Sequence, residues 1–261
     1  MAYADVLQAI SLPEAFITIG GLSGHRSEDK FGRIDDVDTG SDPEDVWNGQ
    51  GLYTGQPENF IAETLTVVSN SAEDAIGGTG AHTLQLFGLD QNGAEVSETV
   101  TLAGQTPVTT TQSFWRCNRN TVLSAGSNRA NVGELVVAAS VTTANVFSVM
   151  PANTNRTAIC AFTIPAAYYG VIRDWTCSAS RSAGGFAQFR LLTRKPGFLY
   201  EVRDFADAQS GANSDHRQLF GMLLPPFSDV KAQVFEVSTN NMAGTSRIDY
   251  VLIEKHIVEG Y

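Results

Sequence analysis

The sequence predicts an all-β protein made of two β-sandwich or jelly-roll-like modules, preceded by an extended and irregular N-terminal arm. Polar and apolar residues alternate over 64–67, 83–86 and 95–102, which places one face of a strand on a core and the other in water. The Asn-Gly pair within 89–93 indicates a hairpin, because that turn needs a positive φ. Apart from one short candidate over 4–12, no segment has the periodicity of an amphipathic helix.

Residues 1–57 differ in composition from the rest of the chain. Glycine and acidic residues are frequent there, and 16–19 is the one segment with a clear strand pattern. A segment of this kind buries little apolar surface by itself. We therefore expect residues 1–57 to form an arm that becomes ordered against a neighbouring molecule.

The remaining sequence divides into two modules. Residues 58–140 are expected to form the first β-sandwich and residues 141–261 the second. Turn signals recur roughly every 8–12 residues, which is typical of sandwiches and barrels. The strands expected in the second module are 158–164, 170–179, 186–193, 198–205, 229–237 and 247–254.

The charge balance argues against nucleic acid as a partner. The chain has 17 basic and 28 acidic residues, a net charge of −11, and no basic cluster. A surface of that sign repels phosphate. No run reaches the ~18 apolar residues that a membrane span needs, and residues 1–10 lack the features of a signal peptide. We expect a soluble protein with neither a membrane nor a nucleic acid as its partner.

The three cysteines are Cys117, Cys160 and Cys177, an odd number without paired spacing. This pattern does not match a disulfide framework. It predicts buried thiols that behave as small apolar side chains, in a protein made in a reducing cytoplasm.

No catalytic or cofactor-binding pattern is complete. Residues 21–25 begin like a nucleophile elbow but lack its final glycine. Residues 77–80 are rich in glycine, but Thr83 stands where a dinucleotide-binding fingerprint requires a third glycine. We therefore expect no enzymatic activity, no catalytic residue and no cofactor.

One acidic loop is similar to part of a calcium-binding loop. Asp36, Asp38 and Asp42 surround Gly40, and carboxylate oxygens suit a hard cation. Trp47 occupies the twelfth position, where such a loop supplies a glutamate. Cation binding and a solvated acidic loop both stay open, and no metal ligand is predicted.

Two aromatic residues of the arm need a surface to cover them. Trp47 and Tyr53 carry large apolar rings within a segment that has little core of its own. We expect a neighbouring subunit, rather than the chain's own sandwich, to cover these rings. The predicted partner-contact residues are Trp47, Leu52, Tyr53 and Phe60.

The segment 42–53, Asp-Pro-Glu-Asp-Val-Trp-Asn-Gly-Gln-Gly-Leu-Tyr, resembles an N-terminal motif of tailed-phage virion proteins. Segments 63–74, 77–81, 108–116 and 122–127 resemble the same proteins. The resemblance implies a virion structural protein and, within that class, a capsid decoration or cement protein. Such proteins are β-rich, are frequently trimeric, and use arms to clamp neighbouring capsomers.

The function expected from the sequence is therefore structural. The protein would lie on the capsid surface of a tailed-phage virion, after synthesis in the host cytoplasm, and would bridge capsomers as a homo-oligomer, in particular a trimer. Its partner would be the major capsid protein. The alternatives are a tail, neck or baseplate component, a receptor- or glycan-binding module with exposed aromatic residues, and a particle-associated hydrolase.

Overall fold

The computed structural model describes residues 21–41, 43–58, 61–181 and 184–260, and leaves the side chains of 215–221 outside the description. The described chain is nearly all-β, which confirms the predicted fold class. It divides into two compact units, each a β-sandwich. Unit 1 combines Met1–Val46 with Cys160–Tyr261, and unit 2 is the continuous segment Trp47–Ile159.

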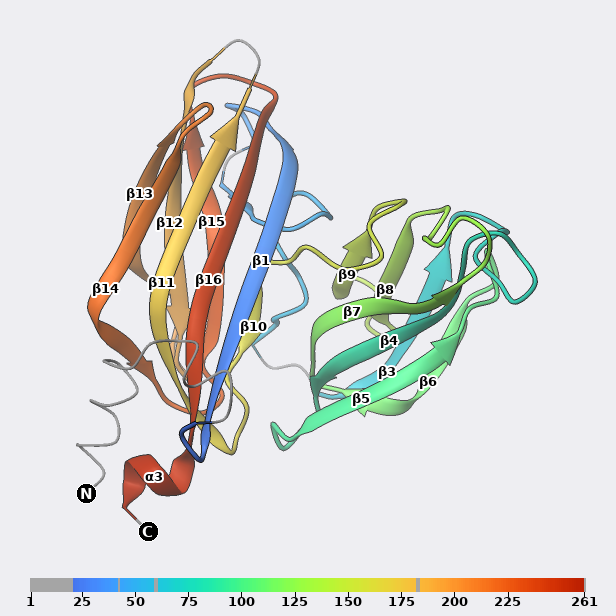
Figure 1. The fold of residues 1–261 in the computed structure, drawn as a ribbon, viewed down its shortest axis with the longest axis horizontal. Helices are drawn as coiled ribbons and strands as arrows, with labels where there is room; N and C mark the ends of the chain where they lie inside the picture. Colours follow the sequence, from blue (N-terminus) through green and yellow to red (C-terminus); the bar gives the residue numbers. More distant parts are fainter. Residues whose placement is uncertain (1–20, 42, 59–60, 182–183, 261) are drawn as a thin grey trace. The chain divides into compact units, whose positions relative to one another are not determined.

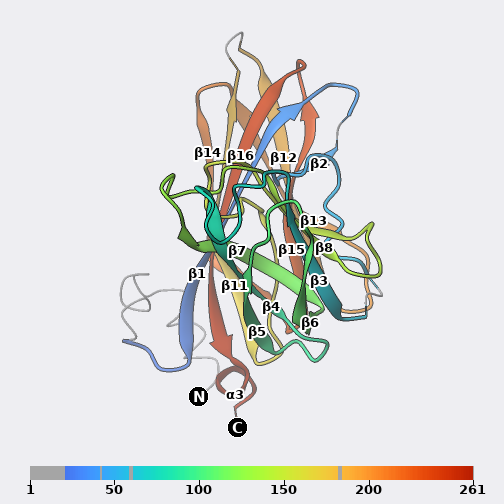
Figure 2. The same ribbon diagram turned by 90° about the vertical axis from the view of Figure 1, so that its right-hand side faces the viewer.

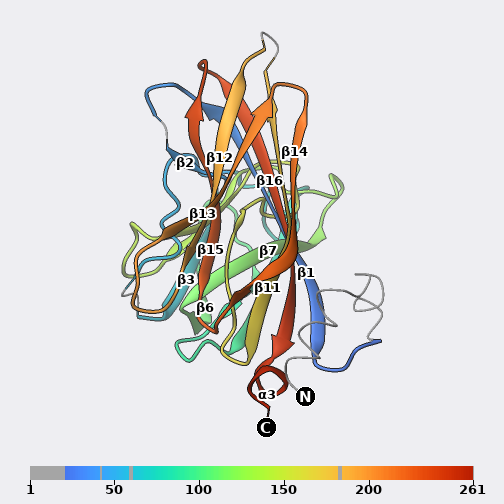
Figure 3. The same ribbon diagram turned by 90° about the vertical axis from the view of Figure 1, so that its left-hand side faces the viewer.

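The described residues of unit 1 form nine strands and one short helix (Figure 1). They are β1 (His25–Val37), β2 (Glu44–Asp45), β10 (Ala161–Thr163), β11 (Tyr168–Ser180), β12 (Phe186–Arg194), β13 (Glu201–Gln209), β14 (Asn213–Leu224), β15 (Asp229–Val237), β16 (Met242–Glu254) and α3 (Lys255–Glu259). One sheet has the order β1-β16-β11-β14, and the other has the order β10-β15-β12-β13, with β2 also paired to β15. Figure 3 views the two layers nearly edge-on.

This strand order is that of a jelly roll. If β2 and β10 count as two halves of one strand, the first strand of the unit pairs with the last, the second with the next to last, and so on inward. The observed pairs are β1 with β16, β2 and β10 with β15, β11 with β14, and β12 with β13, all antiparallel. A long hairpin rolled into two layers produces this pattern, which is the double-sheet jelly roll.

The core of unit 1 lies between the two sheets, and its largest fully buried side chain is Trp175. The rings of Phe162 and Tyr250 are stacked with their centroids 4.1 Å apart. The end of β16 is apolar on both faces because Val251 and Ile253 pack on the outer side, where Ile257 of α3 contacts them. The strand expected over 247–254 is confirmed as part of β16, which lies between β1 and β11 in its sheet.

Unit 2 is inserted within the second strand of the jelly roll. Three backbone hydrogen bonds, each 2.9 Å long, join the two ends of the insertion to β15. The amide of Cys160 donates to the carbonyl of Val46, and the amide of Val46 donates to the carbonyl of Ala232. The amide of Ala232 donates to the carbonyl of Cys160. The two ends of the insertion therefore lie side by side on β15. Gly32 of β1 lies against the same point, because a Cβ there would be 2.3 Å from Cys160 N and 2.4 Å from Val46 O.

Unit 2 is a smaller sandwich, and its described residues form seven strands (Figure 2). They are β3 (Glu63–Ser69), β4 (Ala81–Leu89), β5 (Glu95–Thr101), β6 (Val108–Phe114), β7 (Arg116–Ala125), β8 (Leu135–Ala139) and β9 (Val146–Met150). Its sheets have the orders β6-β3-β8-β9 and β5-β4-β7, and they enclose one apolar core. The predicted hairpin joins β4 to β5, and Gly93 takes its positive φ of 72°.

The carboxylate of Asp74 joins three loops of unit 2. Its side chain is fully buried, and Oδ1 accepts hydrogen bonds from the amides of Ala81 and Val132, both at 2.8 Å. Oδ2 accepts from the Gly133 amide at 2.8 Å and from the Ser69 hydroxyl at 2.6 Å. These four donors offset the cost of burying the charge and fix the loops relative to one another.

The predicted N-terminal arm is wrong for the described part of residues 1–57. Residues 25–37 form β1, a strand of the jelly roll, and residues 47–57 belong to the compact unit 2. The sequence conceals β1 because Lys30 and Gly32 occupy buried positions of the strand, where an apolar residue would have given the alternation. Residues 1–20 lie outside the described residues.

The predicted module boundaries at 58–140 and 141–261 also differ from the structure. The strand β9 belongs to the first sandwich, and the jelly roll takes β1 and β2 from the N-terminal side of unit 2. A domain assembled from two distant segments leaves no local mark in composition, so the sequence alone suggested a simple succession of modules.

We predict that Gly32→Ala destabilises the protein by about 1–3 kcal/mol, because the new Cβ meets backbone atoms that cannot move aside. Chemical denaturation measures this directly. Gly40→Ala is the matched control, because a Cβ at Gly40 has no atom within 4 Å. Equal midpoints for the two variants would show that the insertion point is not tightly packed.

We also predict that Asp74→Ala destabilises unit 2 by about 3–5 kcal/mol, because it leaves buried donors without an acceptor. The isosteric Asp74→Asn should also be destabilising, because the NH₂ group of asparagine would face N–H or O–H groups that now donate to the carboxylate. The thermal midpoint of the isolated segment 47–159 and of the full chain would report the change. The neighbouring exposed Glu73→Gln serves as control, and an Asp74→Ala protein as stable as this control would refute the assignment.

Candidate partner interface

Trp47 and Tyr53 are buried within unit 2, with 4% and 8% of their surface exposed. Their rings meet edge to face with centroids 5.1 Å apart. The Trp47 indole donates to the carbonyl of Gly51 at 3.1 Å, and the Tyr53 hydroxyl donates to the carbonyl of Phe147 at 3.0 Å. The expectation that a neighbouring subunit covers these two rings is therefore wrong, because the chain covers them itself.

Glycines explain why the sequence predicts an irregular arm where residues 47–57 belong to a compact sandwich. A Cβ at Gly49 would lie 2.2 Å from the Trp47 ring, and a Cβ at Gly55 would lie 2.2 Å from the Tyr53 hydroxyl oxygen. These glycines make room for the rings, whereas their frequency in the sequence indicated an irregular arm. Of the other predicted contact residues, Leu52 is 58% exposed, and its contact with a partner stays a prediction. Phe60 lies outside the described residues.

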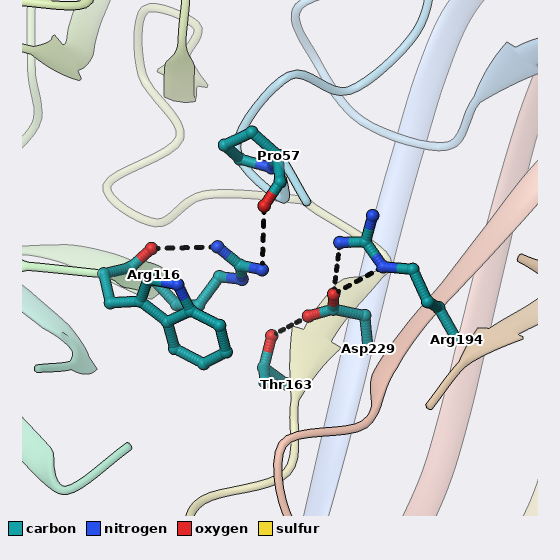
Figure 4. Close-up of polar contacts among 6 residues, drawn as sticks. Pro57, Arg116, Thr163, Arg194 and Asp229 are labelled. Carbon is teal, nitrogen blue, oxygen red and sulfur yellow. Dashed lines mark hydrogen bonds and ion pairs between the residues drawn. The ribbon is translucent and has the colours of Figure 1, made fainter. Parts of the chain in front are cut away.

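A buried arginine also holds this segment, and sequence reasoning missed it. The Arg116 guanidinium lies 3.8 Å from the centroid of the Trp115 ring and donates to the carbonyls of Trp115 and Pro57, both at 3.1 Å (Figure 4). Arg116 is 1% exposed. It therefore ties residue 57 to the start of β7 inside unit 2.

The outer surface of the β10-β15-β12-β13 sheet carries a set of exposed apolar side chains. We call this set the apolar face; its members are Phe186, Val202, Phe205 and Phe235, exposed by 37%, 42%, 47% and 37%. Strand alternation directs these residues outward, since their neighbours Ala187 and Ala206 point into the core. Contiguous exposed apolar residues of this kind mark interaction surfaces more often than isolated ones do.

Two rings of the apolar face, Phe205 and Phe235, contact each other and a neighbouring arginine. Phe205 and Phe235 meet edge to face at 6.2 Å, and the Arg190 guanidinium lies 4.6 Å from the Phe235 centroid. Arg190 also donates to the side-chain oxygen of Gln233 at 2.6 Å. Phe235 occupies a register shift between β12 and β15, a bulge that redirects one side chain. A rigid aromatic surface loses little conformational entropy on binding.

A row of charged groups continues from the apolar face along the same sheet. Asp45 accepts from Gln233 at 2.9 Å and from Lys231 at 2.7 Å. The Tyr200 ring lies under two cations, with Arg194 at 4.6 Å and Lys231 at 4.7 Å from its centroid. The contacts join β2, β15 and β12, so they brace the sheet that carries the apolar face.

A buried ion pair between Arg194 and Asp229 lies at the end of the same sheet. Asp229 accepts two hydrogen bonds from Arg194, at 3.0 and 2.5 Å, and a third from the Thr163 hydroxyl (Figure 4). Both charged side chains are at most 10% exposed. Removal of one partner would leave a buried charge, so the pair fixes β10, β12 and β15 at this end.

The acidic loop provides no assembled cation site among the described residues. The Asp38 carboxylate accepts from the amide of Asn241 at 2.8 Å, and Asp42 lies outside the described residues. Within the described ranges, no three His, Cys, Asp or Glu side chains cluster in a way that could hold a metal ion. The same ranges contain no helix long and apolar enough to cross a membrane.

The three thiols are free and buried, as predicted. In unit 1, Cys160 and Cys177 both point to the Ser246 hydroxyl, at 3.5 and 3.6 Å, which also accepts the Trp175 indole N–H at 2.9 Å. Burial raises the pKa of Cys160 to about 12 and raises the pKa of Cys177 well above its ordinary value. Because thiolates are the reactive form, these side chains are inert in the folded protein.

No protein-family model matches the chain, and no curated protein matches it significantly. Among solved structures, the chain is similar to particles of infectious bursal disease virus. A T13 viral particle aligns over 98% of this chain and 78% of the other, at 9% identity and a TM-score of 0.27. The VP2 subviral particle aligns over 95% and 79%, at 9% identity and a TM-score of 0.25. TM-scores this low do not establish a common fold.

We predict that the native protein at pH 8 does not react with an aromatic disulfide reagent, and that all three thiols react once guanidinium unfolds it. The raised pKa values keep Cys160 and Cys177 protonated, and burial excludes the reagent from all three thiols. The absorbance of the released thiolate counts the reacting groups. Rapid modification of a native thiol would show that the core opens on the timescale of the assay.

Proposed function

We propose that this protein is a structural component of a virus particle, and specifically a capsid decoration protein of a tailed phage. The observation that carries the proposal is the apolar face, a rigid and exposed aromatic surface on a jelly-roll sheet. Jelly rolls serve as viral capsid domains and as lectin domains, so the fold by itself does not choose between these roles.

Two further features support a structural role over the alternatives. The chain's net charge of −11 disfavours contact with nucleic acid, which leaves a protein as the partner of an apolar surface. The three thiols are buried, and the ionic groups beside the apolar face form the ion pairs Arg194–Asp229 and Lys231–Asp45. We propose that the protein has no enzymatic activity and binds the major capsid protein through the apolar face, as a homo-oligomer.

The sequence resemblance to tailed-phage virion proteins supports the particular kind of particle. The segments that carry the resemblance lie mostly in unit 2, whereas the apolar face lies in unit 1. We therefore propose that the jelly roll of unit 1 attaches the protein to the capsid. The exposed Leu52 of unit 2 remains a second candidate contact.

The proposal predicts that Phe205→Ser with Phe235→Ser weakens binding to particles that lack the protein by roughly 30-fold, the effect of removing a central aromatic contact. Co-sedimentation with such particles measures the apparent affinity. Phe31→Ser is the matched control, because Phe31 is 43% exposed on a strand of the other sheet. Equal binding by the double variant and the wild type would refute the role of the apolar face.

Electron microscopy of gold-labelled particles distinguishes a capsid decoration protein from a tail, neck or baseplate component. Labels over the head shell are expected, and labels at the tail or baseplate would replace the decoration role with a tail role. Binding to an array of glycans, lost in the Phe205→Ser and Phe235→Ser variant, would instead identify a receptor-binding module.

A further inference from the structure

The hairpin between β12 and β13 ends in two of the most exposed apolar side chains of the described residues. Phe198 is 61% exposed and Leu199 is 77% exposed. The turn before them is Lys195-Pro196-Gly197-Phe198, with the Phe198 amide donating to the Lys195 carbonyl at 3.0 Å and Gly197 at φ 78°. Proline at the second position and a glycine with positive φ at the third define a type II turn. The tip, defined as residues 195–199, is therefore held in one shape.

Unit 2 contains an open pocket of about 550 Å³, within the range of small-molecule and side-chain sites. Its rim carries Ile61 and Val141, exposed by 78% and 82%, and Pro57 contributes to the wall. Within the described residues, neither rim side chain is covered. The tip in unit 1 and the pocket rim in unit 2 thus both expose apolar side chains to solvent.

The pocket is formed in advance by polar contacts behind its rim. The Glu63 carboxylate accepts hydrogen bonds from the amides of Val141 and Thr142, at 2.5 and 3.1 Å, and holds the loop that carries Val141. The amide of Ala62 donates to the Gln91 side chain at 2.5 Å. A preformed pocket and a preformed tip can associate without an additional ordering cost.

The charges beside the two features have opposite signs. Lys195 begins the tip and is exposed, whereas Glu58 is exposed one residue from the pocket wall and Glu63 lines the pocket. In a chain with 17 basic and 28 acidic residues, an exposed lysine beside an apolar tip is suited to an acidic pocket. Complementary charge steers association and selects the partner.

We infer that the tip of one copy inserts Phe198 and Leu199 into the pocket of a second copy. Tip and pocket are different surfaces, so the contact is head-to-tail: it closes into a ring if the rotation allows and otherwise extends into a row. A contact made by one hairpin tip is small and therefore weak in isolation. Repetition around a ring or along a surface strengthens it through effective concentration.

Site-specific disulfide trapping tests this contact in solution, with no particle present, so its result is independent of the proposed function. One protein carries Leu199→Cys and a second, of different size because of a fusion tag, carries Val141→Cys. The native cysteines do not interfere because they are buried. Ile76→Cys is the matched control for the second protein, since Ile76 is 66% exposed on unit 2 and does not line the pocket. The substituted residues are exposed, so the variants should fold.

Under mild oxidation, the mixture of Leu199→Cys and Val141→Cys should form the mixed disulfide roughly tenfold faster than the mixture of Leu199→Cys and Ile76→Cys, a ratio typical of a weak specific contact. Equal rates would overturn the inference. A chain that carries both Leu199→Cys and Val141→Cys should give a ladder of linked oligomers. An internal disulfide within a single chain would overturn it, because the tip would then occupy its own pocket.

The charge argument has its own test in the same assay. Lys195→Glu in the Leu199→Cys protein should slow trapping several-fold, and Glu58→Lys in the Val141→Cys protein should restore the rate. If both changes leave the rate unaltered, the proposed role of Lys195 and Glu58 in selecting the second copy is refuted.

Discussion

The hydrogen bonds among Val46, Cys160 and Ala232 hold both halves of the jelly roll's second strand on β15, although all of unit 2 lies between those halves in the sequence. The insertion is tolerated because its two ends lie side by side, so the inserted sandwich need not stretch the strand that it interrupts. Gly32 completes the arrangement, since β1 approaches the junction more closely than any side chain would permit. The continuity of the jelly roll's second strand depends on this connection.

The polar side chains on the outer surface of the β10-β15-β12-β13 sheet have a mechanical role. Arg190 packs against the Phe235 ring and donates a hydrogen bond to Gln233, and Phe235 in turn meets Phe205 edge to face. Lys231 and Arg194 each combine an ion pair with a contact to the Tyr200 ring at the other end of the sheet. An exposed aromatic surface on a flexible loop would lose part of its binding energy to ordering, whereas this surface does not.

The contacts proposed for this protein lie on surfaces of both units. The apolar face on the jelly roll and the tip of its β12–β13 hairpin are separate features of unit 1, and the pocket behind Ile61 and Val141 belongs to unit 2. The two proposals use different residues, so binding to a particle and contact between copies can be tested separately. The net charge of −11 makes copies of the chain repel one another in general, which limits non-specific association. A local pair of opposite charges, such as Lys195 and Glu58, therefore has more influence on which surfaces of two copies meet.

The sequence by itself determined the fold class and the position of most strands. Alternation located β3, β4 and β5, and the odd cysteines correctly indicated buried thiols. These features are local, because one strand's pattern reflects the two faces of that strand alone. Only the tertiary structure decided that β1 and β2 belong with β10–β16, that glycines make room for Trp47 and Tyr53, and that exposed rings gather on one sheet. Each of these depends on residues far apart in the chain that meet only after folding, and no window of the sequence contains both partners.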